Sequence, residues 1–149
     1  MPGIHAAGDV ASFFDPLFGR RRRIEHWSNA NYQGSEVGTI LAGRDGGYDT
    51  VSTFFTESFG LMLKVFGDTA RHDDHLTRGS FVDGGAAICF YFDNERLVGT
   101  LQAGQDDETE ETLKRLIRSR AKPRDLEALA EQSVPLADVF EETTSDSPR

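Results

Sequence analysis

The chain has 149 residues, of which 38% are hydrophobic and 28% charged, and its formal net charge is −9. This length fits one domain, or one domain plus a smaller unit, and the composition is that of a soluble globular protein. The negative charge argues against nucleic-acid binding, which requires a cationic face. No apolar run approaches the ~20 residues that span a bilayer. We therefore expect no membrane partner. The single cysteine, Cys89, excludes a disulfide framework within the chain, so we expect a cytoplasmic protein.

The first 23 residues predict one short strand and a loop. Residues 3–9 are small and apolar and end in Gly-Asp, which predicts a buried strand followed by a turn. Residues 13–23 are expected to be a loop, because an Asp-Pro pair and a glycine interrupt them. The four arginines at 20–23 indicate a solvated or acid-paired segment rather than a nucleic-acid signal.

A helix is predicted over residues 28–41, whose apolar positions form one stripe, with Gly43 as its C-terminal cap. A Gly- and Asp-rich linker at 43–49 is the best candidate for a domain boundary, which we place after residue 46. The expected units are residues 1–46, residues 47–140 and a disordered polar tail at 141–149.

Beyond the linker the pattern changes to short strands, expected at 51–56, 61–66, 75–81, 86–92 and 96–104. Asp93-Asn94-Glu95 has the chemistry of a hairpin turn between the last two. Helices are predicted at 106–121 and 125–130, followed by a last turn at 136–140. The first of these has acids at its start and bases at its end, which complements the helix dipole. The fold class should be α+β, a small antiparallel sheet with C-terminal helices beside a βα unit.

The Gly8-Asp9 pair carries the most chemical information. Ligands bind outside the carboxyl ends of strands in α/β sheets, and a carboxylate there can accept hydrogen bonds from sugar or ribitol hydroxyls. Taken alone, however, a Gly-Asp pair is more often a plain turn.

Three blocks give the chain a family resemblance. Residues 2–11 resemble the second flavin-binding signature of flavoprotein reductases with two dinucleotide-binding folds. Residues 21–30, followed by Gln33-Gly34, resemble the next block of ferredoxin reductases, dioxygenase reductase components and apoptosis-inducing factor. Arg78-Gly79, the strand at 86–92 and the elements after it resemble the reductase C-terminal domain. From about residue 2 to 140 the chain is thus similar to the C-terminal part of an FAD-dependent pyridine nucleotide-disulfide oxidoreductase.

This resemblance implies that Asp9 binds the ribitol chain of FAD and that Gly8, Asp9, His26 and Trp27 are cofactor-binding residues. Trp27 would lie beside the isoalloxazine as the catalytic residue, although a lone tryptophan without such a resemblance is more often structural. The helix after it would point its N-terminus at the flavin, where backbone N–H groups stabilise negative charge. Residues 1–46 would be a remnant of the FAD-binding domain. The implied reaction passes electrons from NAD(P)H through FAD to a ferredoxin-type iron–sulfur protein.

The chain departs from this family in one respect that bears on activity. No Gly-x-Gly-x-x-Gly follows a strand, so the phosphate cradles for FAD and NAD(P)H are missing. We expect the isolated chain to be inactive and to need the FAD/NAD-binding half as its partner. The alternative is a standalone module that forms a homodimer or complements a separately encoded flavoprotein half. A weaker third hypothesis is an independent small-ligand binder.

Other residues favour structural roles. Phe54, Phe55 and Phe59 are expected in the core, with a wall of the flavin site as the second interpretation. Cys89 is expected to be a buried, inert thiol. The cluster at 72–75 (His-Asp-Asp-His) favours a solvated turn over a metal site, for which we propose no ligand.

Overall fold

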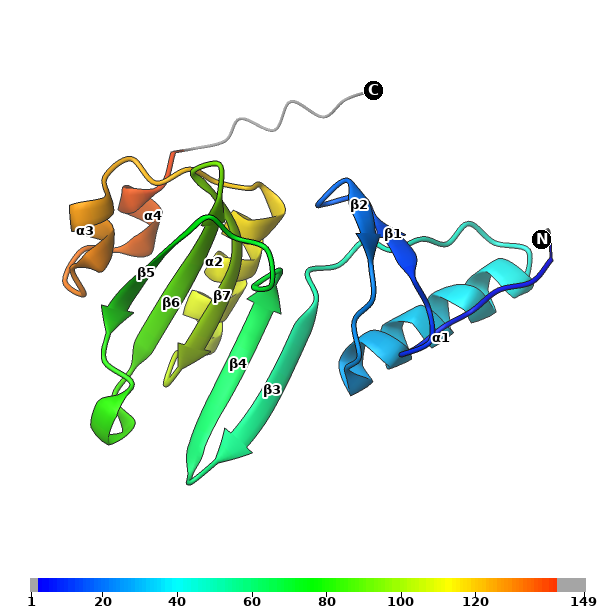
Figure 1. Ribbon diagram of the computed structural model, residues 1–149, viewed down its shortest axis with the longest axis horizontal. Helices are drawn as coiled ribbons and strands as arrows, with labels where there is room; N and C mark the ends of the chain where they lie inside the picture. Colours follow the sequence, from blue (N-terminus) through cyan, green and yellow to red (C-terminus); the bar gives the residue numbers. More distant parts are fainter. Residues whose placement is uncertain (1–2, 142–149) are drawn as a thin grey trace. The chain divides into compact units, whose positions relative to one another are not determined.

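The computed structural model describes residues 3–141. The described residues form two compact units, which divide between residues 54 and 55 (Figure 1). None of the helices in the described part is long and apolar enough to cross a membrane.

The first unit consists of a small hairpin and one long helix. Strands β1 (Phe13–Asp15) and β2 (Arg20–Arg22) pair antiparallel, with Phe13 opposite Arg22. Helix α1 spans Trp27–Leu41, as expected from its apolar stripe. It ends before Gly43, which has a φ of +76° and is therefore suited to the left-handed position after a helix.

The expected loop at residues 13–23 is wrong, because these residues form the β1–β2 hairpin. The Asp15 carboxylate accepts a hydrogen bond from the Leu17 N–H at 3.0 Å and closes the turn. The same carboxylate pairs with the Arg22 guanidinium at 2.8 Å, and both side chains are buried. The residues that suggested a loop therefore form the turn of a hairpin, and one of the four arginines is an internal ion-pair partner.

The strand expected at residues 3–9 does not form, and Ile4 is 67% exposed rather than buried. A strand requires a neighbour that takes up its backbone hydrogen bonds, and no other described segment pairs with this one. Its last residues make a turn, in which the Ala11 N–H donates to the Gly8 carbonyl at 2.9 Å.

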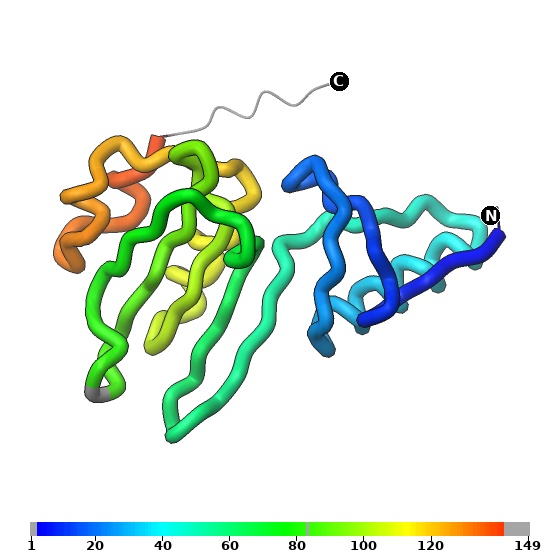
Figure 2. Tube along the Cα trace, in the orientation of Figure 1, coloured from blue at the N-terminus to red at the C-terminus, as the bar shows by residue number. Residues whose placement is uncertain are grey.

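The second unit is built on a five-stranded antiparallel sheet with the strand order β3-β4-β7-β6-β5. Figure 2 shows the path of the chain through its hairpins. The strands are β3 (Thr53–Ser58), β4 (Leu61–Gly67), β5 (Asp74–Gly79), β6 (Ala87–Asp93) and β7 (Arg96–Ala103). A short 3-10 turn, Val82–Gly84, precedes β6.

Three helices complete this unit: α2 (Asp107–Arg118), α3 (Leu126–Ala130) and α4 (Leu136–Val139). Helix α2 packs on β4 and β7, and α3 packs on β5 (Figure 1). The apolar core between sheet and helices includes Phe66, Phe90, Leu97, Leu113, Ile117, Leu129 and Phe140. The α+β fold class is confirmed, and all five strands and three helices of this unit lie within a few residues of their predicted positions.

Two tight turns close hairpins of this sheet. The β6–β7 loop is Asn94-Glu95, with φ of 51° and 62°, and the β3–β4 loop is Phe59-Gly60, with φ of 53° and 76°. Both are two-residue loops with two positive φ values, the geometry that fits the twist of a hairpin. Phe59 and Phe55 are exposed, so the expectation that they belong to the core is wrong. Of the tail expected at residues 141–149, residues 142–149 lie outside the described part of the chain.

Candidate functional site

The predicted site residues Gly8 and Asp9 lie in a tight turn against helix α1. Gly8 has a φ of +80°, which L side chains rarely adopt, and a methyl group added to it would lie 3.6 Å from the Ala30 Cβ atom. Asp9 is exposed, whereas Ala11 at the end of the turn is buried. The backbone is therefore held on both sides of Asp9 while its carboxylate faces solvent.

Gln33, from the second turn of α1, fixes this turn to the helix. Its Oε1 atom accepts a hydrogen bond from the Gly8 N–H at 2.8 Å, across 25 residues of sequence. Gln33 is only 6% exposed. Its Nε2 atom is buried and has no hydrogen-bond partner among residues 3–141.

His26 and Trp27, the other two predicted site residues, lie at the start of α1. His26 is the N-cap residue, but its side chain makes no capping hydrogen bond. Instead its ring stacks on Phe54, with centroids 4.1 Å apart and an interplanar angle of 15°. Trp27 is 79% exposed, so its indole contributes little to the core of this unit and is free to contact a ligand.

No acidic residue occupies the first turn of α1. The positive end of the helix dipole is therefore not neutralised by a neighbouring carboxylate on the helix itself. The hydrogen bond from Gly8 goes to Gln33, which lies six residues, or just under two turns, beyond Trp27 along the helix that His26 caps. Within the described residues, no hydrogen bond joins the Gly8-Asp9 pair directly to the His26-Trp27 pair.

Asn29 and Tyr48 stiffen the beginning of this helix. The buried Asn29 donates from Nδ2 to the Ile24 carbonyl at 3.0 Å and accepts from the Tyr48 hydroxyl at 3.1 Å. Burial, and after it the negative charge of Asp15, raises the pKa of the Tyr48 hydroxyl to about 12. The hydroxyl therefore stays protonated, and a donor to Asn29, over the physiological pH range.

Sequence reasoning missed Gln33 and Asn29 as site-supporting residues, since the partner of Gln33 is Gly8, 25 residues away, and the Asn29 oxygen bonds to Tyr48, 19 residues away. The sequence feature that could have identified them is their position on the buried face of the helix, where apolar side chains are expected and two amides stand instead. The Asp9 carboxylate, which only accepts, the unpartnered Gln33 amide donor and a helix N-terminus without a side-chain cap together suit a ligand that has hydroxyl and other acceptor oxygens.

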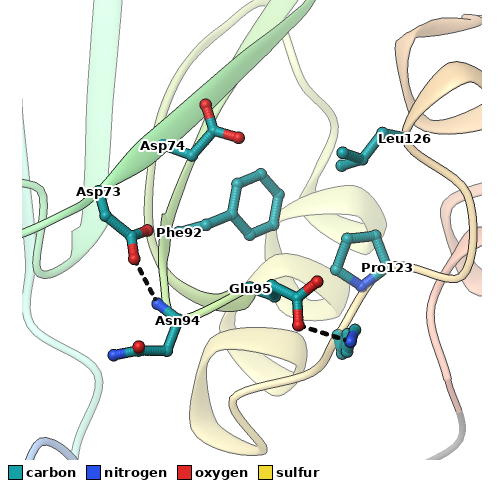
Figure 3. A pocket seen from close by; sticks show the side chains of 8 residues that line it. Asp73, Asp74, Phe92, Asn94, Glu95, Pro123 and Leu126 are labelled. Atoms are coloured by element: carbon teal, nitrogen blue, oxygen red, sulfur yellow. Dashed lines mark hydrogen bonds and ion pairs between the residues drawn. The ribbon is translucent and has the colours of Figure 1, made fainter.

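The second unit contains a separate surface pocket of about 470 Å³ (Figure 3). Phe92, Pro123 and Leu126 form its apolar part, and Glu95 pairs with Lys122 at 2.7 Å. The Asp73 carboxylate accepts from the Asn94 N–H at 2.9 Å, and the Asp74 carboxylate from the His75 N–H at 2.8 Å. Each of these three carboxylates thus already has a partner within the protein.

The side chains at 72–75 are occupied by local contacts. His72 interacts through Nδ1 with the Thr69 carbonyl at 3.1 Å and packs edge-on against Tyr91 at a centroid distance of 4.8 Å. No group of three or more His, Cys, Asp or Glu side chains in residues 3–141 is arranged to hold a metal ion. Cys89 is a free, buried thiol.

Comparison with known proteins places these features in a family context. The reductase C-terminal family matches residues 53–140. The chain is 28% identical over 139 residues to putidaredoxin reductase of Pseudomonas putida, covering 93% of this chain and 32% of that protein. It is 25% identical over 153 residues to monodehydroascorbate reductase 3 of Arabidopsis thaliana, covering 97% and 34% respectively.

Among solved structures, the covalent complex of putidaredoxin reductase with putidaredoxin matches with a TM-score of 0.79 at 28% identity, over 92% of this chain and 32% of that one. A ferredoxin reductase from Rhodopseudomonas palustris matches with a TM-score of 0.72 at 26% identity, over 89% of this chain and 32% of that one. The chain spans about a third of the length of the relatives it matches.

Proposed function

Because this chain belongs to the reductase C-terminal family, we propose that it is the C-terminal portion of an FAD-dependent NAD(P)H oxidoreductase of the ferredoxin-reductase type. When bound, FAD supplies the chemistry of accepting a hydride from NAD(P)H and passing on single electrons. The observation that carries the proposal is the hydrogen bond between Gly8 and Gln33. It joins the Gly-Asp turn to the helix that begins with Trp27, so that the flavin-binding residues implied by the resemblance belong to one preformed unit.

Each residue of this unit has a role that its surroundings support. Asp9 accepts hydrogen bonds from ribitol hydroxyls, since its carboxylate is exposed on a turn that is held at both ends. Gly8 allows the positive φ of that turn. Trp27 offers an exposed indole face for an aromatic ring. The N–H groups at the start of α1 favour negative charge nearby, and His26 is held in place by its stacking on Phe54.

The rest of the parent enzyme would supply what this chain lacks. The chain contains no Gly-x-Gly-x-x-Gly motif to bind the phosphates of FAD or NAD(P)H. Its partners would be the FAD/NAD-binding half and a ferredoxin-type iron–sulfur acceptor. This acceptor is supported by the relative whose structure is a complex of putidaredoxin reductase with putidaredoxin.

Two measurements test the proposal. Titration calorimetry of the isolated chain with FAD should find no submicromolar binding, because the phosphate cradle is absent; tight binding would contradict the fragment assignment. In a protein that joins the chain to the FAD/NAD-binding half of a relative, Asp9→Ala should lower flavin retention more than Trp27→Ala. Trp27→Ala should change turnover at near-normal flavin content. Equal flavin loss in both variants would contradict these roles.

A second function, a standalone dimerisation or interaction module, is favoured by the exposed aromatic side chains of the β3–β4 hairpin. Phe55 is 64% exposed and Phe59 fully exposed, which is costly for a surface that meets only water. Sedimentation of the isolated chain separates the two functions. A stable dimer of the isolated chain would favour the module.

A further inference from the structure

The side-chain amide of Gln33 has a hydrogen-bond partner for its oxygen but none, within residues 3–141, for its nitrogen. Its oxygen accepts from the Gly8 N–H at 2.8 Å, which fixes the orientation of the amide, because only the oxygen can accept from an N–H donor. Its nitrogen is buried without a hydrogen-bond partner among residues 3–141. A buried amide donor without a partner is costly, and buried polar groups in folded proteins almost always have a hydrogen-bond partner, whether from the protein, from ordered water or from a bound group.

The position of this donor identifies what it would meet. Because Gln33 holds the residue immediately before Asp9, the amide lies at the base of the turn that carries the Asp9 carboxylate. Asp9 can only accept hydrogen bonds when ionised, whereas the Gln33 nitrogen can only donate. An alcohol group does both, since it donates through O–H and accepts through the oxygen lone pairs. Neither a carbonyl nor an ionised phosphate oxygen could serve Asp9, because both lack a proton to donate.

We propose that Gln33 is a positioning and specificity-determining residue for the ribitol chain of a flavin. Its Nε2 atom would donate a hydrogen bond to a ribitol hydroxyl group, and the Asp9 carboxylate would accept one from the same hydroxyl. This inference rests on the proposed function and deepens it. The hydrogen bond to Oε1 holds the turn in place in the absence of ligand, and the ligand hydroxyl provides the hydrogen-bond acceptor for Nε2. Asn29, on the same helix, is the internal contrast: it is also a buried amide, but both its nitrogen and its oxygen already have partners in the protein.

The test uses the full chain labelled with ¹⁵N, and compares riboflavin, which carries ribitol, with lumiflavin, which has the same ring system without it. Riboflavin should shift the side-chain amide resonances of Gln33 and leave those of Asn29 unchanged. Lumiflavin should leave both unchanged. Equal shifts of the Gln33 amide by the two compounds, or no shift with riboflavin up to its solubility limit, would overturn the inference.

Variants of Gln33 separate the role of its nitrogen as a donor to the ligand from the role of its oxygen as the acceptor for the Gly8 N–H. Gln33→Glu, assayed at a pH at which the new carboxylate is ionised, keeps an acceptor for the Gly8 N–H but has no donor. It should weaken riboflavin binding about tenfold while the Gly8 amide stays protected from hydrogen exchange. Gln33→Met should lose both binding and protection, and Asn31→Met, at an exposed position of the same helix, should lose neither. Wild-type riboflavin affinity in Gln33→Glu would overturn the inference.

Failure of this inference and failure of the proposed function have different signatures. If the joined protein retains FAD while the Gln33 amide does not respond to riboflavin, only the role of Gln33 is overturned. If the joined protein binds no FAD at all, the proposed function itself is contradicted.

Discussion

Arg78 on β5 is predicted to be the main polar link between the sheet and the α3–α4 segment. Its Nη2 atom donates to the carbonyls of Gln132 at 2.9 Å and Val134 at 2.7 Å, and its Nη1 atom lies 3.5 Å from the Leu129 carbonyl. Replacing Arg78 by Met keeps much of the aliphatic volume and removes all three hydrogen bonds. The carbonyls at the end of α3 and in the loop after it then lose their charged partner.

The expected cost follows from the two shorter hydrogen bonds. A hydrogen bond to a charged group contributes about 1.5–3 kcal/mol, but one of the two is exposed to solvent and contributes less. Burial also lowers the pKa of Arg78, because desolvation disfavours the charged guanidinium, and we expect this to offset part of the gain. We therefore expect Arg78→Met to lower the free energy of unfolding by roughly 2–3 kcal/mol, and Arg78→Lys by about half as much, since an ammonium group cannot span the same acceptors.

Urea denaturation followed by circular dichroism measures this effect, with the exposed Arg71→Met as the matched control. The midpoint should fall for Arg78→Met without a change in the slope, and should be unchanged for Arg71→Met. A loss below about 0.5 kcal/mol, the range of ordinary surface substitutions, would refute the argument. So would equal losses in the two variants.

Three further predictions concern stability. Phe59→Asn should raise the free energy of unfolding by about 1 kcal/mol, because the exposed Phe59 has a φ of 53° in a two-residue hairpin turn that favours Asn-Gly; a lower urea midpoint would contradict this. Gln102→Met should stabilise by about 1 kcal/mol, since both amide atoms of the buried Gln102 lack partners within residues 3–141; destabilisation in urea would indicate that water completes them. The pKa of Tyr48 is raised from 10.0 to about 12, so the folded state favours the neutral hydroxyl. Its contribution is fully present below pH 10.0 and is lost as the pH rises toward 12. Tyr48→Phe should therefore flatten the alkaline loss of stability, and an unchanged pH profile would rule out this assignment.

The elements that could be predicted from sequence are those whose determinants are local. Helix α2 carries its own start signal, as the Asp106 side chain accepts from the Thr109 N–H at 2.8 Å, and its apolar face is continuous. The Asn94-Glu95 turn has suitable residues between two strands of clear pattern. Both positions were therefore predicted closely.

The features that were missed depend on partners that are distant in sequence. The β1–β2 hairpin depends on the buried pair of Asp15 and Arg22, which looks like unrelated charges in the sequence. The importance of Gln33 depends on Gly8, 25 residues away. The strand expected at residues 3–9 had the correct composition, but composition cannot provide the neighbouring strand that it requires. The resemblance identified Gly8, Asp9, His26 and Trp27 as site residues, and their roles remain predictions.

The central claim is most directly tested by reduction of a flavin in a protein that joins this chain to the FAD/NAD-binding half of a relative. The joined protein should be purified with bound flavin, and its visible flavin absorption should bleach when NADH or NADPH is added without oxygen. The flavin-binding half without this chain serves as the control and should hold less flavin or be reduced more slowly. A joined protein that carries no flavin, or whose flavin neither pyridine nucleotide reduces, would contradict the account.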